Sequence, residues 1–161
     1  MRIYVASSWR NKRQPAVVEA LRGDGHQVYD FRNPEPGDNG FAWSEIDPDW
    51  QQWTPEKYRE MLAHPIAHRG FSKDMRALED ADYVVLVMPC GRSAHLEFGH
   101  GLGRGKPCFI LMEEAAEPEL MYAAADYICL TLESLRKVVG DQAKADNDAD
   151  AQNEINLEKT S

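Results

Sequence analysis

The stretch SAHLEFGHGLGRGKP, residues 93–107, has the pattern of an amphipathic helix except for one glutamate in its first turns, whose carboxylate could take part in chemistry. Glu97 follows a strongly apolar run, and a carboxylate at the end of a buried strand can act as a nucleophile or stabilise developing positive charge. A simpler interpretation is an acid near the start of a helix, where it complements the helix dipole. Because glycine weakens helices, the glycines that follow at alternate positions predict close approach of another group: Gly99, Gly101, Gly103 and Gly105.

Metal and cofactor chemistry find little support in the same stretch. His95 and His100 are five residues apart, which splits them across a helix, and the H-E-x-x-H spacing of zinc peptidases is absent. Glu97 and His100 have the spacing of carboxylate-bridged metal bundles, but such bundles need four contributing helices. The dinucleotide pattern G-x-G-x-x-G is also absent. The sequence therefore predicts no metal and no cofactor.

Hydrophobic periodicity predicts the elements that must position Glu97. Short runs rich in β-branched and aromatic residues predict strands at 2–7, 26–31, 83–88, 108–112 and 127–131. The run 83–88 lacks polar alternation, which is typical of a central strand covered on both faces. Helical patterns lie around these strands, at 11–25, 55–63, 71–81, 93–103 and 132–139.

Strands that alternate with helices at this spacing predict right-handed crossovers and a parallel sheet. We therefore predict an α/β fold, a doubly wound (flavodoxin-like or Rossmann-like) five-stranded parallel sheet with helices on both faces. Residues 1–140 form the predicted domain. The segment 141–161 holds six acidic residues against two lysines and almost no large apolar residues, so we expect an acidic, flexible tail there.

Ligands of doubly wound sheets bind at the carboxyl ends of the strands, where the connections diverge. The segment 33–55 is long, turn-rich and contains three tryptophans, which predicts a lid or wall for a flat ligand. Aromatic side chains available for stacking on that ligand are Trp9, Phe41 and Trp43. Polar and small residues at the strand ends complete the candidates for ligand binding: Ser7, Ser8, Arg10, Gly91, Arg92 and Ser93.

Composition excludes several classes of partner and location. The formal net charge of -9 argues against a nucleic-acid polymer, because binding phosphate backbones requires concentrated Lys and Arg. No apolar run approaches the ~20 residues that span a bilayer, and the N-terminal residues lack the apolar core of a signal peptide. We expect a cytoplasmic protein with no membrane partner. Its three widely spaced cysteines are then expected to be reduced thiols: Cys90, Cys108 and Cys129.

Three segments carry a resemblance to a known family: IYVASSWRNKRQ (3–14), SKDMRALEDADYVVLV (72–87) and HLEFGHGLGRGKPCFIL (95–111). In order, they resemble the nucleoside 2-deoxyribosyltransferases and the related nucleoside 5′-monophosphate N-glycosidases. The resemblance covers most of residues 2–131. It places Tyr4 where the family has a tyrosine that orients the nucleophile, Asp74 where it has an active-site aspartate, and Glu97 where it has the nucleophile.

Two departures from the family's pattern bear on the substrate. Gly91 stands where the transferases usually carry an acidic sugar-binding residue, and Gly101 replaces a common alanine. A carboxylate suits a 5′-hydroxyl but repels a 5′-phosphate, whereas hydroxyls, backbone N–H groups and arginine bind phosphate. Because the candidates at the strand ends are of the second kind, the sequence favours a nucleoside 5′-monophosphate over a nucleoside.

The predicted function is therefore hydrolysis of the N-glycosidic bond of a nucleoside 5′-monophosphate or nucleoside. Glu97 stabilises the oxocarbenium-like transition state or forms a glycosyl ester, Asp74 or a water that it positions helps the base take a proton, and Tyr4 holds Glu97 by a hydrogen bond. A 2-deoxyribosyltransferase that exchanges bases is an alternative, because only the acceptor differs. A non-catalytic nucleotide-binding module is a second alternative. The resemblance also implies a homodimer or a higher homo-oligomer.

Overall fold

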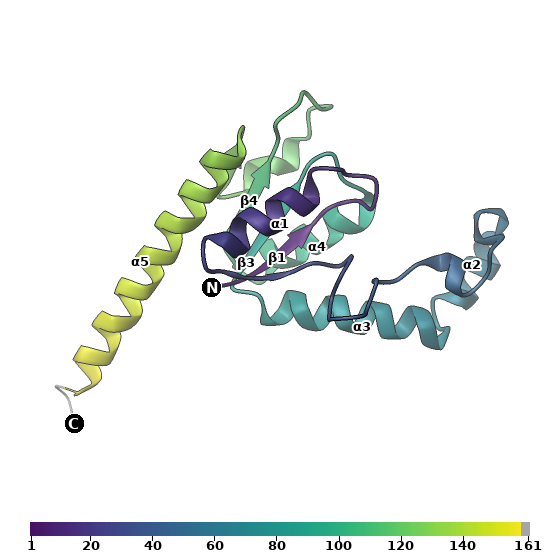
Figure 1. The fold of residues 1–161 in the computed structure, drawn as a ribbon, viewed down its shortest axis with the longest axis horizontal. Helices are drawn as coiled ribbons and strands as arrows, with labels where there is room; N and C mark the ends of the chain where they lie inside the picture. The colour runs from purple at the N-terminus through teal and green to yellow at the C-terminus, as the bar shows by residue number, and fades with distance from the viewer. Residues whose placement is uncertain (159–161) are drawn as a thin grey trace.

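The structure is a computed structural model that describes residues 1–158, and its centre is a five-stranded sheet (Figure 1). All neighbouring strands are parallel, in the order β2-β1-β3-β4-β5. The connections therefore diverge between β1 and β3, which is where ligands of such sheets bind. The strands are β1 (Arg2–Ala6), β2 (Gln27–Tyr29), β3 (Tyr83–Val87), β4 (Cys108–Leu111) and β5 (Tyr127–Cys129). The predicted five-stranded parallel sheet is confirmed.

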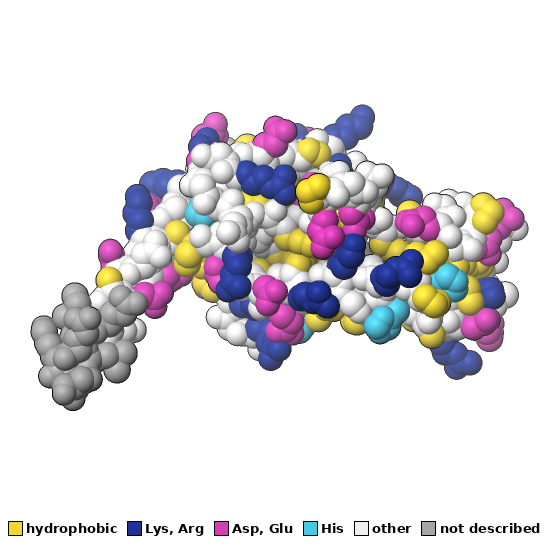
Figure 2. Space-filling view, turned by 60° about the horizontal axis from the view of Figure 1, so that its bottom comes forward, with side chains coloured by type: hydrophobic (Ala, Val, Ile, Leu, Met, Phe, Trp, Pro, Cys, Tyr) yellow, Lys and Arg dark blue, Asp and Glu magenta, His cyan; other side chains and the backbone are white. Residues whose placement is uncertain are grey.

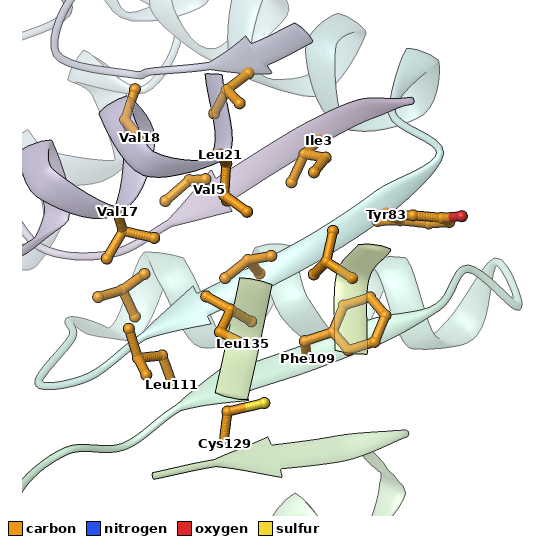
Figure 3. Close-up of a cluster of buried hydrophobic side chains, with 14 of the residues drawn as sticks. Ile3, Val5, Val17, Val18, Leu21, Tyr83, Phe109, Leu111, Cys129 and Leu135 are labelled. Atoms are coloured by element: carbon orange, nitrogen blue, oxygen red, sulfur yellow. The ribbon is translucent and has the colours of Figure 1, made fainter. Parts of the chain in front are cut away.

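One face of the sheet is covered by α1 (Gln14–Gly23) and α5 (Leu132–Glu158). The side chains between these helices and the sheet are almost wholly apolar, as Figure 3 shows for α1 packed over β1. Val5 of β1, Leu21 of α1 and Leu135 of α5 are completely buried there. This face supplies a conventional hydrophobic core.

The opposite face is covered by α3 (Pro65–Asp80) and α4 (Arg92–Gly103), which confirms helices on both faces. Side chains of a strand alternate between the two faces, so β1 directs Val5 to the first core and Tyr4 to this second one. The second core is apolar near its centre, around Leu86 and Phe98. At the carboxyl ends of β1 and β3 it becomes polar, and the candidate site lies there.

The long connection between β2 and α3 contains two 3-10 turns, η1 (Trp43–Glu45) and η2 (Trp50–Gln52), and the short helix α2 (Pro55–Met61). Figure 1 shows α2 beyond the sheet, near one end of α3. Part of the connection packs directly on the backbone of α3. A Cβ added to Gly70 would lie 2.9 Å from Cβ of Phe41, so only glycine fits without a shift.

Two predicted elements differ from the structure. The helix expected from residue 71 begins at Pro65, because His64 caps it: His64 Nδ1 accepts a hydrogen bond from the Ile66 N–H at 3.3 Å. The helix expected at 132–139 continues as α5 to Glu158, through most of the segment expected to be an acidic, flexible tail, with the Tyr83 hydroxyl donating a hydrogen bond to Asp146. Residues 159–161 of that expected tail lie outside the described residues.

The described helices include none that is both long enough and apolar enough to cross a membrane. All three cysteines are free: Cys108 and Cys129 are buried, and Cys90 is partly buried beside the candidate site.

Candidate active site

Glu97 lies in the second turn of α4, five positions after its first residue, Arg92. The first turn of α4 contains no acidic residue, and the effect of the helix dipole fades within one turn. The simpler interpretation of Glu97 as a dipole-complementing acid therefore loses its support. Its side chain is partly buried and is close enough to Tyr4 of β1 and Asp74 of α3 to interact with both electrostatically.

The Glu97 and Asp74 carboxyl groups form a close pair of acids. Burial, and after it the negative charge of Asp74, raises the pKa of Glu97 to about 7, while the Tyr4 hydroxyl acts in the opposite direction. Burial also raises the pKa of Asp74, and a hydrogen bond from Tyr29 partly offsets that rise. Near neutral pH, burial and mutual repulsion therefore favour a proton on one of these two carboxyl groups.

Tyr4 is completely buried beneath the two acids. Burial and the charges of Glu97 and Asp74 raise the pKa of its phenol, so it remains protonated and can only donate to an anion. Within the described residues its hydroxyl makes no hydrogen bond of normal length and angle, although it is close enough to Glu97 to lower the pKa of that carboxyl group. The structure thus brings Tyr4 and Glu97 together as the sequence predicts, with the hydrogen bond between them only partly formed. A buried unsatisfied hydroxyl is unfavourable, so any change that closes this bond is stabilised.

Tyr29 is a site residue that the sequence analysis missed. Its hydroxyl donates a hydrogen bond to Asp74 Oδ1 at 2.8 Å, and its ring stacks on that of Tyr4 with centroids 5.3 Å apart. The two tyrosines are register partners in the parallel pairing of β1 with β2. The available signal was the position of Tyr29 near the end of the second predicted strand, opposite Tyr4.

A cleft runs from Asp74 along the segment between β2 and α3. Tyr29, Phe41 and Lys73 are among the residues that line it, together with Asp74. Glu97 lies outside this lining, and Asp74 is the one member of the acid pair that lines the cleft. The face that Figure 2 presents has Lys and Arg interspersed with Asp and Glu, with hydrophobic side chains exposed between them.

Phe41 and Trp43, the predicted aromatic contacts, take different places. Phe41 lines the cleft, whereas Trp43 packs edge-on behind it with centroids 4.8 Å apart. Trp43 also packs against Trp53 and Tyr58, so the aromatic cluster forms a wall with Phe41 on the side of the cleft. Lys73 of α3 holds this segment by an ion pair with Asp38.

Ser7, a predicted ligand contact, is turned into the protein. Its hydroxyl is buried, donates to the Val87 carbonyl at 2.8 Å and accepts from Asn11 Nδ2 at 3.1 Å. The same Asn11 amide lies within hydrogen-bond distance of the Val87 and Pro89 carbonyls. These bonds tie the end of β1 to the end of β3. Asn11, which the sequence analysis did not single out, is the residue that links the two loops.

The rest of the β1–α1 loop is shaped by Arg32, which the sequence analysis also missed. One guanidinium nitrogen of Arg32 donates to the carbonyls of Ser8, Trp9 and Asn11 at 2.9, 2.9 and 2.7 Å. The Arg32 guanidinium also lies over the Trp9 ring, 5.8 Å from its centroid. Trp9 and Arg10 remain exposed on the outside of the loop and are available to a ligand.

Gly91, Arg92 and Ser93 lie at the N-terminus of α4, with Gly91 at the capping position. Gly91 offers no side chain to cap the helix, so the first N–H groups of α4 remain available to an anion. The Gly91 carbonyl accepts a hydrogen bond from His95 Nδ1 at 2.9 Å, which fixes the loop that leads into the helix. Arg92 and Ser93 are exposed there.

Two of the glycines that follow Glu97 are explained by the packing of α4 and the turn after it, not by a bound ligand. A Cβ at Gly101 would lie 2.7 Å from Val84 Cγ2, because α4 crosses the sheet closely at this point. Gly99 and Gly103 face open space, and Gly105 has a φ of +68° at the turn after the helix. The close approach predicted from the glycines is therefore confirmed only for Gly101, and the approaching group is strand β3.

Metal and thiol chemistry gain no support from the geometry. In residues 1–158, no group of three or more His, Cys, Asp and Glu side chains is arranged to hold a metal ion. Cys90 lies beside Glu97, and burial together with the charge of Glu97 raises its pKa to about 11. Cys90 is therefore protonated at neutral pH and is a poor nucleophile.

Comparison with known proteins identifies the fold. The structure is similar to a solved 2-deoxyribosyltransferase from the psychrotolerant bacterium Bacillus psychrosaccharolyticus, with a TM-score of 0.56 and 19% sequence identity over 84% of this chain and 90% of that chain. The two proteins share a fold. A second solved structure, the CMP N-glycosidase of Clostridium botulinum, aligns with a TM-score of 0.49 and 14% identity over 87% of this chain and 99% of that one. No model of a known family and no curated protein matches the sequence.

Proposed function

We propose that the protein is an N-glycosidase that hydrolyses the bond between sugar and base in a nucleoside 5′-monophosphate. The observation that carries this proposal is the convergence of Glu97, Asp74 and Tyr4 at the carboxyl ends of β1 and β3, next to an aromatic-lined cleft. The fold shared with a 2-deoxyribosyltransferase supports the same class of chemistry.

The reaction divides into two steps in this proposal. The Glu97 carboxylate attacks the anomeric carbon, the carbon–nitrogen bond breaks, and the electron pair moves to the base nitrogen, which takes a proton from Asp74 or from a water that Asp74 holds. Water then cleaves the glycosyl ester, which releases the sugar phosphate and regenerates Glu97. Closing the hydrogen bond from Tyr4 favours the ionised form of Glu97 that the attack needs.

Groups suited to binding a 5′-phosphate lie on two loops, the one before α4 and the one between β1 and α1. The free N–H groups of α4, with Arg92 and Ser93 beside them, suit a dianion, and Arg10 lies on the neighbouring loop. The two loops are joined through Asn11. Ser7 is left out of this set because its hydroxyl is already bonded inside the protein.

Base exchange is the second candidate, and the shared fold with a 2-deoxyribosyltransferase is the observation in its favour. The two activities differ in whether water or a second base attacks the glycosyl ester. Adding a different free base to the reaction separates them, because a transferase forms a new nucleoside or nucleotide whereas a hydrolase releases only sugar and base.

The test is release of free base from each common ribo- and deoxyribonucleoside and its 5′-monophosphate, followed by chromatography. We expect Glu97→Gln to reduce release by about 10³-fold or more while nucleotide affinity changes little, because the variant lacks the nucleophile but keeps the pocket. Glu19→Gln, at an exposed position of α1, is the matched control and keeps full activity. Equal release by the Glu97 variant would overturn the proposal, and affinity without any release by the wild type would favour the binding module.

A further inference from the structure

Each tyrosine of the site is paired with one acid, but the two contacts differ. The Tyr29 hydroxyl donates to Asp74 Oδ1 at 2.8 Å, whereas the Tyr4 hydroxyl faces Glu97 without a hydrogen bond of normal length and angle, although it is close enough to lower the pKa of Glu97. The stacked rings of the two tyrosines fix both hydroxyls relative to each other. The two acids are therefore held by their tyrosines in different ways.

This asymmetry decides where the negative charge lies. Two neighbouring, partly buried carboxylates repel each other when both are ionised, and the one that accepts a hydrogen bond is the more stable anion. Asp74 accepts a well-formed bond from Tyr29, whereas the contact of Glu97 with the Tyr4 hydroxyl is looser. Asp74 is therefore the favoured anion of the pair, and Glu97 is the favoured holder of the proton.

We propose that Tyr29 is a positioning residue of the acid pair: its hydroxyl fixes Asp74 Oδ1, leaves Oδ2 for the ligand, and keeps the negative charge on Asp74 and the proton on Glu97. The proposal deepens the proposed function and rests on it for its catalytic consequence. The arrangement of charge itself is a property of the unliganded protein and can be measured without any substrate.

The groups that act on the pair come from several elements. Asp38 from the segment after β2 and Lys73 from α3 oppose each other at Asp74, the first raising and the second lowering its pKa. The thiol of Cys90 also lies near Glu97 and stays protonated. The titratable and charged neighbours include Tyr4 of β1, Tyr29 of β2, Asp38, Lys73 of α3 and Cys90 before α4, and Glu45 and Arg69 line the same cleft as Asp74.

The proposal gives the proton of the reaction a defined source. Before attack, Glu97 transfers its proton to Asp74, so that one acid becomes the nucleophile and the other becomes the proton donor to the base. No proton is gained or lost in this transfer. Tyr29 stays protonated throughout, since burial and the charge of Asp74 raise the pKa of its phenol, and it keeps Asp74 oriented before and after the transfer.

The first experiment titrates the two carboxyl groups by NMR in protein labelled with ¹³C at the Asp and Glu side chains, with Glu97→Gln and Asp74→Asn used for assignment. In Tyr29→Phe, which keeps the stacked ring but removes the hydroxyl, we expect the pKa of Asp74 to rise. As Asp74 loses its charge, the pKa of Glu97 is expected to fall. Opposite shifts of two neighbours are not produced by a general loosening of the fold.

Two variants control this experiment. Tyr83→Phe removes a hydroxyl that also donates to an aspartate, Asp146, but on the opposite face of the sheet, and should leave both carboxyl groups unchanged. In the Asp74→Asn background, Tyr29→Phe should no longer alter the pKa of Glu97, because its effect passes through Asp74. Circular dichroism of each variant confirms that it is folded.

The second experiment measures base release. We expect Tyr29→Phe to lower kcat about tenfold with little change in KM, since a hydrogen bond to a charged group is lost, and to have no further effect in Asp74→Asn. Unchanged carboxyl pKa values in Tyr29→Phe, or shifts in the same direction, overturn the proposal. If only the proposed function is wrong, the wild type releases no base, but Tyr29→Phe still shifts the pKa values of Asp74 and Glu97 in opposite directions.

Discussion

The two faces of the sheet are built from the same strands but hold different kinds of side chain. On the face of α1 and α5, β1 places Val5 among aliphatic residues, whereas on the face of α3 and α4 it places Tyr4 beneath Asp74 and Glu97. Burial on the first face stabilises the fold. On the second face it leaves a phenol unsatisfied and holds a carboxyl group at a raised pKa, both of which are unfavourable. Because successive side chains of β1 point to opposite faces of the sheet, one face stabilises the fold and the other holds the candidate site.

The largest expected effect comes from a cavity on the apolar face, which tests whether the two faces are independent. Leu135→Ala removes a completely buried side chain of α5, and we expect a loss of about 2–5 kcal/mol in the free energy of unfolding. Base release per folded molecule should not change, because the site lies on the other side of the sheet. Urea denaturation and an activity assay at low temperature measure the two quantities. A large fall in kcat of folded protein would show that the faces are coupled.

The second prediction concerns pH and the unfavourable burial of Glu97. The ordinary pKa of 4.5 applies when the chain is unfolded, and the folded value is about 7. Between these values the native state binds more protons than the unfolded state, so the contribution of Glu97 to stability falls as pH rises and stays low above pH 7. Glu97→Gln does not titrate. It should match the wild type near pH 4 and be more stable by a few kcal/mol at pH 8.

Urea denaturation of both proteins at several pH values checks this prediction. Only the difference between them matters, since the carboxyl groups other than Glu97 and its coupled neighbour Asp74 titrate alike in both. A difference that does not vary with pH would show that Glu97 has an ordinary pKa in the folded protein.

The smallest expected effects come from two glycines of α4 that are two positions apart. Gly101→Ala forces a Cβ against Val84 and should destabilise the protein by about 1–3 kcal/mol. Gly99→Ala adds a methyl group in open space and should stabilise it by about 0.5–1 kcal/mol, because alanine favours the helix. Thermal denaturation compares them. Similar effects of both substitutions would contradict the close packing of α4 on β3.

Much of the architecture could be predicted because it depends on local patterns. The apolar run 83–88 predicted the central strand β3, and the alternation of strands and helices predicted the parallel sheet. The start of α3 was missed because the cap involves His64, which is not a common capping residue. The long helical extension of α5 was missed because its composition is highly polar, and composition alone does not show that a helix continues.

The site was harder to predict because it depends on contacts between distant residues. Glu97, Asp74 and Tyr4 could be found through motifs, and the structure brings them together. Tyr29 was missed because its importance comes from the register between β1 and β2. Ser7 illustrates the same dependence on packing: its position at a strand end suggested a ligand contact, and in the structure its hydroxyl bonds to β3. Whether a polar group faces a ligand or the protein is decided by packing.

All four tryptophans of the chain lie between residues 9 and 53, in the loops and 3-10 turns after β1 and β2, and no tryptophan lies in either core. Intrinsic fluorescence consequently reports on the rim of the cleft rather than on the sheet. A quenching agent or a bound purine would be detected directly by this emission. During chemical denaturation, the same emission would follow detachment of the aromatic wall, so a spectroscopist needs a second probe, such as far-ultraviolet circular dichroism, to observe loss of the sheet.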